Sequence, residues 1–181
     1  GDELPLTDLL EMMIDSQPVF VLIGRRVSGI VTLSDLGKPA GRLFIFSIIL
    51  AFEKSLKRLF DSELGEEVIR EHITPDRVAR IDSTFNLKLK KNQELDWVDC
   101  LQLCDVFDSK IWGVLGLLER VQLSGKSLDK KKKIVMSMRD SIAHAGDPFG
   151  SLSALAALRE LSWIRGMFYE IDNLRNEPVA S

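Results

Sequence analysis

An arginine and a histidine lie five residues apart near the end of a predicted amphipathic helix, in the segment from Met138 to Gly146. The histidine, His144, is one of only two in the chain, and Arg139 precedes it. A guanidinium is charged at any physiological pH and can neutralise a phosphate, whereas an imidazole can move a proton near neutrality. Together these groups are the minimum needed to cleave a phosphodiester without a metal ion.

The spacing of the pair limits how it can act. On an ideal helix, five residues turn through about 140°, so Arg139 and His144 do not share a face. They converge if the helix ends between them, for which Gly146 and Pro148 are suitable breakers, or if two copies of the motif meet across a dimer. Three interpretations therefore remain open: a catalytic pair, a non-catalytic binding pocket, and a pair that only packs and caps the helix.

The bulk composition is that of a globular protein. The chain has 181 residues, of which 45% are hydrophobic and 28% are charged, and its net charge is −3. This acidic balance gives no electrostatic footprint for binding duplex DNA. The longest apolar run, from Leu43 to Phe52, is far short of the roughly 20 residues that span a bilayer. We therefore expect no membrane partner and, because no secretory signal is visible, a cytoplasmic location.

The two cysteines are expected to be reduced thiols in the core. Cys100 and Cys104 lie four residues apart in a predicted helix, where they would share one face. Neighbours on a helix rarely offer the geometry of a disulfide. No further cysteine or nearby histidine completes a zinc site, so no metal site is expected.

The first forty residues mix short helices and strands. Apolar residues at helical spacing predict a helix over 7–15 with Thr7 as its N-cap. Two β-branched runs follow, PVFVLIGRR and VSGIVTL, with a hairpin turn at Gly24-Arg25-Arg26. A helix is expected to start at Ser34-Asp35, and the segment 38–41 is expected to interrupt it before the next helix.

The remainder of the chain is predicted to be helical. Thr74 is expected to cap a helix that has Pro75 at its first position. Helices are predicted over 43–60, 66–72, 75–89, 95–121 with a break at Asp108 or Gly113, 127–145 and 151–174, with a loop over 88–93 and Ser151 or Ser153 capping the last helix.

The segment SGIVTLSDL, at Ser28 to Leu36, resembles the second half of a CBS repeat. That family ends its last strand and opens its last helix with a Gly-apolar-apolar-Thr-x-x-Asp pattern, which residues 29–35 match. The resemblance implies that Thr32 and Asp35 bind an adenosine nucleotide (AMP, ATP or S-adenosylmethionine) as a regulator. It covers only residues 4–42, less than one repeat, and CBS repeats work in pairs. The alternative is structural, with Asp35 as an N-cap and Thr32 as a strand-end residue.

Residues 43–175 resemble a HEPN domain, an all-helical domain with an Arg-x4–6-His motif in which Asn, Asp or His often follows the arginine. Here Asp140 follows Arg139, and His144 comes after a spacer of four residues. SIILAFEKSLKRLF is similar to the family's first helix, and LDWVDCLQLCDVFDSKIW to its middle segment. The resemblance implies a homodimer in which two motifs face one cleft.

The activity implied by this resemblance is metal-independent cleavage of RNA. His144 would act as general acid or base, and Arg139 would stabilise charge on the phosphate oxygens. Asp140 would orient the histidine or the arginine, although its charge opposes the approach of RNA. Glu53 would hold the motif arginine; its alternative is a surface ion pair with Lys57 at i,i+4.

The sequence thus predicts a mainly α protein: a HEPN-like helical bundle over 43–175, preceded by a small α/β piece over 1–42 and followed by a tail over 176–181. The predicted function is a metal-independent endoribonuclease with a composite dimeric site, which requires no cofactor and is regulated by an adenosine nucleotide. The alternative is a non-catalytic module for dimerisation or for binding a nucleotide or a partner.

Overall fold

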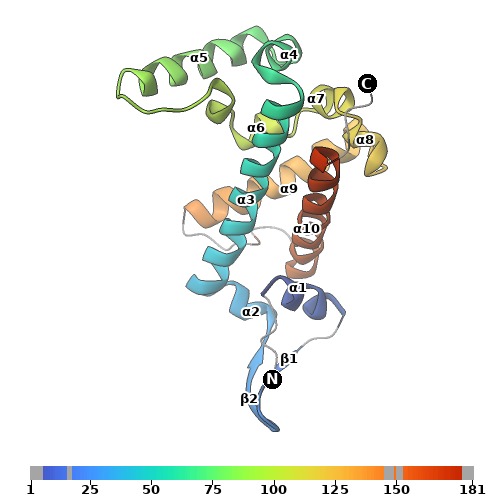
Figure 1. Cartoon of the computed structure of the whole chain (residues 1–181). Coiled ribbons are helices and arrows are strands. Elements are labelled where there is room, and N and C mark those ends of the chain that lie inside the picture. The colour runs from blue at the N-terminus through green and yellow to red at the C-terminus, as the bar shows by residue number, and fades with distance from the viewer. Residues whose placement is uncertain (1–5, 16–17, 145–148, 150–152, 177–181) are drawn as a thin grey trace. The chain divides into compact units, whose positions relative to one another are not determined.

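The computed structural model describes residues 6–15, 18–144, 149 and 153–176. The described chain is mainly helical and carries a two-stranded antiparallel sheet near its N-terminus, as predicted (Figure 1). It divides into two compact units, one made of residues 1–50 and 134–168 and the other of residues 51–133 and 169–181. Three long helices, α3, α9 and α10, contribute residues to both units, and each unit is described by itself.

The first unit combines the sheet with helical segments from both ends of the chain. Its elements are α1 (Leu6–Asp15), β1 (Val19–Ile23), β2 (Arg26–Val31), α2 (Leu33–Leu36), the start of α3 (Pro39–Glu63), the end of α9 (Gly125–Ala143) and most of α10 (Ala154–Asn176). Arg165 of α10 holds α1 by ion pairs with Asp8 (2.8 Å) and Glu11 (3.2 Å). Ser153 caps α10, because its Oγ accepts from the backbone N–H of Ala156 at 3.2 Å. Ser151, the other predicted cap, lies outside the described residues.

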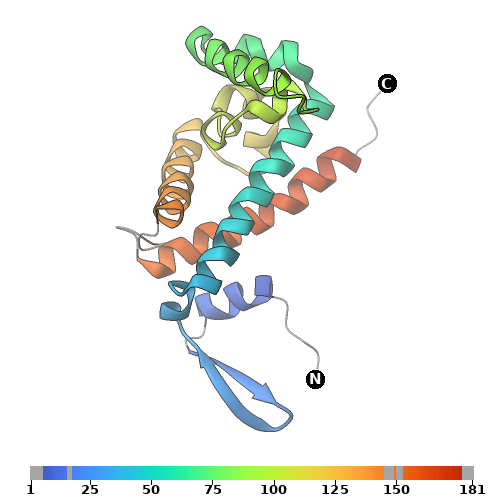
Figure 2. The ribbon, with the colours of Figure 1, turned by 90° about the vertical axis from the view of Figure 1, so that its left-hand side faces the viewer.

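The hairpin of β1 and β2 extends away from the helices of its unit (Figure 2). Its turn is Gly24-Arg25, where Gly24 has φ +62°, a conformation that glycine adopts without steric cost. Leu22 pairs with Val27 and Val21 with Gly29, so Ser28 is the extra residue of a bulge. Large apolar side chains are exposed along both strands: Phe20, Val21, Leu22, Ile23, Val27 and Ile30.

Polar substitution at the tip of this hairpin is expected to leave stability almost unchanged. Ile23 is 71% exposed and Val27 is 61% exposed, so changing both to threonine removes little buried surface and keeps β-branching. We expect the free energy of unfolding to change by less than about 0.5 kcal/mol in urea titrations. Val19→Thr is the matched control: Val19 is only 7% exposed, and burying its hydroxyl should cost about 1–3 kcal/mol. A large loss in the Ile23→Thr/Val27→Thr variant would contradict the exposed hairpin.

The junction between α2 and α3 differs from the predicted interruption at 38–41. Pro39 is the first residue of α3 rather than a breaker, because the first N–H of a helix has no intrahelical partner to lose. Gly41 lies in the first turn, where a Cβ would come within 2.5 Å of the Cα of Leu36. A side chain at residue 41 would therefore push α3 away from α2.

The second unit consists mostly of short helices. It contains the rest of α3, α4 (Gly65–His72), α5 (Pro75–Leu89), the 3-10 helix η1 (Trp97–Cys100), α6 (Leu103–Val106), α7 (Ser109–Val114), α8 (Leu117–Arg120), the start of α9 and the last residues of α10. Thr74 precedes α5, and Pro75 is its first residue, as predicted.

The predicted helix over 95–121 is instead four short helices. Asp108 does break it, since its carboxylate accepts from the backbone N–H groups of Lys110 (2.8 Å) and Ile111 (3.4 Å). Gly113, the other predicted break, lies within α7, and the chain turns instead at Gly116, which has φ +67°. Side-chain contacts within this segment stabilise its path. The indole N–H of Trp112 donates to the carbonyl of Val106 at 2.7 Å, and its ring stacks on Phe107 at 6.0 Å.

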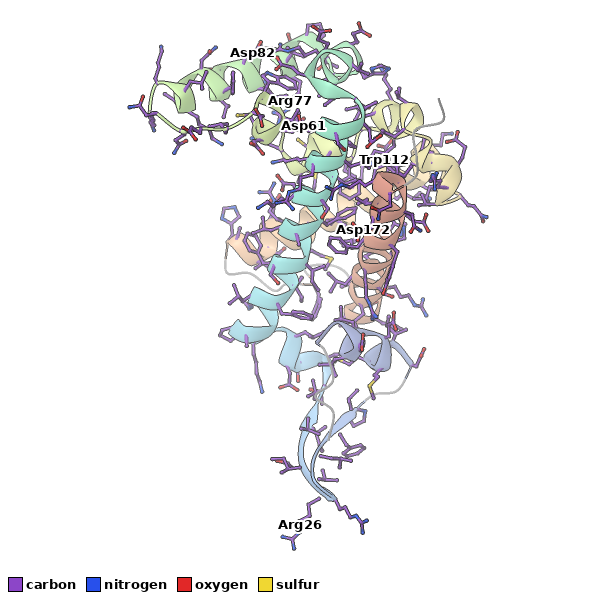
Figure 3. The ribbon with its side chains drawn as sticks, viewed as in Figure 1. Arg26, Asp61, Arg77, Asp82, Trp112 and Asp172 are labelled. Carbon is purple, nitrogen blue, oxygen red and sulfur yellow. The ribbon has the colours of Figure 1, made fainter. Side chains whose placement is uncertain are left out.

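Two ion-pair clusters join helices of the second unit, and Figure 3 labels one member of each, Asp82 and Arg77. Arg70 of α4 pairs with Asp82 of α5 and lies 4.4 Å over the ring of Trp97, whose indole N–H also donates to Asp82 at 2.7 Å. Hydrogen bonds from Arg70 and Trp97 lower the pKa of the Asp82 carboxyl. In the other cluster, Arg77 binds Asp105 through Nε (2.6 Å) and Nη2 (2.8 Å).

Candidate functional site

The Arg-His motif lies on α9, which remains helical through the motif. The backbone N–H of His144 donates to the carbonyl of Asp140 at 3.0 Å, which is the i→i−4 bond of an α-helix. The helix therefore does not end between Arg139 and His144, and they do not converge in that way. Gly146 and Pro148, the predicted breakers, lie outside the described residues.

The exposure of the motif follows from its position around the helix. Val135 and Met138 are buried and mark the face of α9 that packs on its own unit. Arg139 lies at the border of that face and is half-buried, whereas Asp140 and His144 are exposed. Asp140 and His144 share the solvent face because they are four residues apart. The motif thus presents its histidine and its acid to solvent, with the arginine beside them.

Asp140 partners Arg139. The Nη1 of Arg139 lies 3.2 Å from Oδ1 of Asp140, and the two side chains are 35% and 53% exposed. An ion pair this exposed contributes little to stability and can open at little cost. Asp140 can therefore hold the guanidinium in the absence of a ligand and release it when a phosphate competes.

Glu53 belongs to the second unit, in the part of α3 after Leu50. Its Oε1 forms an ion pair with Nζ of Lys57 at 2.7 Å, which is the i,i+4 alternative considered for it. Both side chains are largely covered, at 18% and 15% exposed, so this is not the surface pair that the sequence suggested. Lys57 also donates to the carbonyl of Asp99 at 3.3 Å.

The second histidine, His72, has a partner that the sequence did not indicate. Its Nδ1 lies 2.8 Å from the carbonyl oxygen of Val68, one turn earlier in α4. The bond closes the C-terminal end of that helix. His72 therefore has a local structural role.

Thr32 and Asp35 form a capping box for α2. The backbone N–H of Thr32 donates to Oδ2 of Asp35 at 2.7 Å, and the Thr32 hydroxyl donates to the same oxygen at 2.9 Å. Thr32 is the N-cap and Asp35 the third helical residue, so the positions differ from the structural alternative, which made Asp35 the cap. Lys38 completes the cluster, with Nζ 2.6 Å from Oδ1 of Asp35.

The Asp35 carboxyl is expected to titrate at about 2 in the folded protein. Its hydrogen bonds to Lys38 and to Thr32 lower the pKa from 3.8 to about 2. Because the pKa is lower in the folded chain, this carboxylate favours folding above about pH 3.9, and its contribution is lost as the pH falls through about 2. Carboxyl ¹³C NMR would measure the midpoint, and Lys38→Gln should raise it. A midpoint near 3.9 in the unchanged protein would contradict the capping box.

The prediction that the two cysteines share one helix face was wrong. Cys100 ends η1 and Cys104 lies in α6, and both are free thiols. Burial raises the pKa of both thiols. Among the described residues, no three His, Cys, Asp or Glu side chains gather as a metal site, and no described helix is long and apolar enough to cross a membrane.

The most buried charge of the described chain, Asp105, was not predicted from the sequence. Asp105 is 6% exposed, and its carboxylate accepts from Arg77 and from the backbone N–H of Gln102 at 2.7 Å. Its position between apolar neighbours in LCDVF was the available signal, because an acid in such a run needs a cationic partner.

Comparison of the chain with protein-family models, with curated proteins and with solved structures finds no match.

Proposed function

We propose that this protein is a metal-independent endoribonuclease whose active site forms between two copies of the chain. Arg139 of one copy and His144 of the other would face the same phosphodiester. The proposal rests on one observation above all: a histidine on the solvent face of a continuous helix, with a half-exposed arginine about 140° away around the same helix.

The exposure of the pair supports a role in binding or chemistry rather than in packing. A histidine that serves only the core would be surrounded by apolar side chains, and an arginine that serves only the core would form a buried ion pair. Instead His144 is exposed, and the pair of Arg139 with Asp140 is open to solvent. A second copy is required because the helical bond from His144 to Asp140 keeps the two side chains on different faces.

The proposed reaction is transesterification. A neutral imidazole of His144 takes the proton of the ribose 2′-hydroxyl, whose oxygen attacks the adjacent phosphorus and displaces the 5′-oxygen of the next nucleotide. The products are a 2′,3′-cyclic phosphate and a 5′-hydroxyl, and the leaving oxygen takes a proton from water or from the imidazolium. Arg139 neutralises the charge that gathers on the phosphate oxygens. Asp140 returns to the guanidinium when the product leaves.

The second candidate is a non-catalytic module for dimerisation or partner binding. Two observations favour it. Asp140 already neutralises the Arg139 guanidinium at 3.2 Å, and the hairpin exposes large apolar side chains that a second chain could cover. In this case RNA would remain intact in the presence of the protein.

Regulation by an adenosine nucleotide is the part of the proposal that concerns Thr32 and Asp35. Both side chains already satisfy each other in the capping box. A hydroxyl of the nucleotide's ribose would therefore have to replace the bond from the Thr32 hydroxyl or the ion pair of Asp35 with Lys38. Cleavage rates with and without AMP would test this coupling.

The experiment that tests the proposed activity is incubation of the purified protein with mixed-sequence RNA in excess EDTA. We expect fragments with 2′,3′-cyclic phosphate and 5′-hydroxyl ends, which are distinguished by their resistance to phosphatase and by mass. Sedimentation of the same sample would establish whether the active species is a dimer. Intact RNA at all protein concentrations would favour the non-catalytic module.

A further inference from the structure

A small pocket in the second unit is lined on one side by arginines and has no assigned role. It has a volume of about 310 Å³. Arg77, Arg80, Ile81 and Thr84 line it from one stripe of α5, and Cys100 and Gln102 line it from the opposite segment. The pocket lies entirely within one compact unit, and Figure 3 labels one of its lining residues, Arg77.

The lining of the pocket carries two arginines, of which Arg77 is paired with the carboxylate of Asp105 behind it. No acidic residue lines the pocket. Asp105 accepts from Nε and Nη2 of Arg77 and from the backbone N–H of Gln102. These bonds fix the plane of the Arg77 guanidinium and leave the two N–H groups of its Nη1 outside the bonds to Asp105. Arg77 is therefore a pre-oriented donor.

Arg80 supplies the uncompensated charge. It lies one turn after Arg77 and is exposed, and its guanidinium has no hydrogen bond or ion pair with any side chain that the structure describes. Its backbone belongs to α5, and the Thr84 hydroxyl donates to the Arg80 carbonyl at 3.0 Å. The guanidinium can thus turn toward a ligand without breaking a hydrogen bond or an ion pair to a described side chain.

The other polar groups of the pocket do not oppose an anion. The side chain of Gln102 is exposed and offers an amide that can donate. Burial raises the pKa of the Cys100 thiol, so this group is uncharged at neutral pH. Two arginines and a glutamine therefore line one small concave space.

We propose that this pocket binds the phosphate group of a small phosphomonoester. Guanidiniums match the oxygens of a phosphate with paired hydrogen bonds, and a phosphate dianion uses both of them. The volume is at the lower end of the range for small-molecule sites and suits a phosphate with a small sugar attached. The inference does not depend on the proposed ribonuclease activity.

Titration of the ¹⁵N-labelled full chain with ribose 5-phosphate, followed by amide NMR at constant ionic strength, tests this site. We expect saturable shifts in residues 77–84 and 100–102 and none with ribose alone. Arg80→Gln should weaken binding about tenfold or more, because it removes charge-assisted hydrogen bonds. Arg58→Gln is the matched control: Arg58 is an exposed arginine of α3 outside the pocket, and its loss should change the dissociation constant less than about twofold.

Three outcomes would overturn the proposal. Shifts that do not saturate, or that spread over the whole surface, would indicate weak general attraction. Equal weakening of ribose 5-phosphate binding by Arg80→Gln and by Arg58→Gln would also indicate weak general attraction. Shifts at these residues with a short single-stranded RNA but not with ribose 5-phosphate would assign the pocket to a nucleic acid. Shifts of the same amides on addition of inorganic phosphate would support the proposal. In the absence of ligand, unchanged amide signals outside the pocket would show that both variants are folded.

Discussion

Replacing His144 with alanine is expected to lower the rate of RNA cleavage in EDTA by a factor of about 10² to 10⁴, the range that one positioned acid or base contributes. The imidazole is exposed on the solvent face of α9, so its loss removes no core contact. We therefore expect the melting temperature and the helical circular dichroism to stay unchanged. A loss of activity without a loss of structure would assign the proton transfer to His144.

His72→Ala is the matched control for this variant. His72 is the other histidine, and its Nδ1 bonds to the backbone carbonyl of Val68 within α4. We expect it to cleave RNA at the unchanged rate while losing some stability at the end of that helix. Equal activity of His144→Ala and the unchanged protein would show that any cleavage comes from elsewhere or from a contaminant.

Mixing two inactive variants tests whether the site is shared between copies. If Arg139 of one chain acts with His144 of the other, a heterodimer of Arg139→Ala and His144→Ala contains one intact site and one site that lacks both groups. An equal mixture should then recover about a quarter of the activity, because random pairing makes half of the dimers mixed and the two-fold symmetry gives each dimer two sites. No recovery after exchange of subunits would place both groups within one chain.

The sequence was sufficient to predict those elements whose conformation depends on residues close together in the chain. The two β-branched runs and the glycine between them specify the hairpin of β1 and β2, because the turn requires the positive φ of Gly24. Thr74 and Pro75 likewise mark the start of α5, since the proline ring is compatible only with the first turn. These elements depend on neighbours a few residues away, which a sequence displays directly.

The sequence did not predict elements whose course depends on particular side-chain contacts between neighbouring segments. Residues 95–121 have helical spacing of apolar side chains, yet they form short helices. The indole N–H of Trp97 reaches Asp82, and the indole N–H of Trp112 reaches the carbonyl of Val106. These hydrogen bonds bend the chain at points that periodicity does not reveal. The predicted interruption at 38–41 was wrong because Pro39 is compatible with the first turn of a helix and Gly41 allows α3 to begin close to α2.

For the candidate site, the sequence identified the residues Arg139, Asp140 and His144, and the structure showed how exposed each of them is. The five-residue spacing already excluded a shared helix face, and the bond from His144 to Asp140 removed the alternative of a helix that ends within the motif. The partner of Arg139 could not be chosen from sequence, because Asp140 and Glu53 were equally suitable acids. The structure pairs Arg139 with Asp140 and pairs Glu53 with Lys57.

The largest effect on stability is expected from Asp105→Ala. The Asp105 side chain is 5% exposed, and its removal leaves the Arg77 guanidinium, 22% exposed, without the carboxylate that its Nε and Nη2 bind. It also leaves the backbone N–H of Gln102 without an acceptor. Breaking a buried ion pair from one side costs about 3–5 kcal/mol, because the remaining charge is desolvated and unpaired. Urea titration monitored by tryptophan fluorescence would measure this loss, since Trp97 and Trp112 lie in the same unit.

Two further variants distinguish the stability lost by breaking the ion pair from the stability lost by removing any carboxylate. Asp129→Ala removes an exposed carboxylate from α9 and should change the free energy of unfolding by less than about 0.5 kcal/mol. The double variant Arg77→Met/Asp105→Leu replaces both charges with apolar groups and should recover most of the stability lost in Asp105→Ala, because no unpaired charge remains. If the double variant were as unstable as Asp105→Ala, the loss would come from the cap of Gln102 or from packing. The same double variant should weaken the binding of ribose 5-phosphate, since Arg77 lines the pocket. Weak binding by a variant of recovered stability would show that the loss of binding does not come from unfolding.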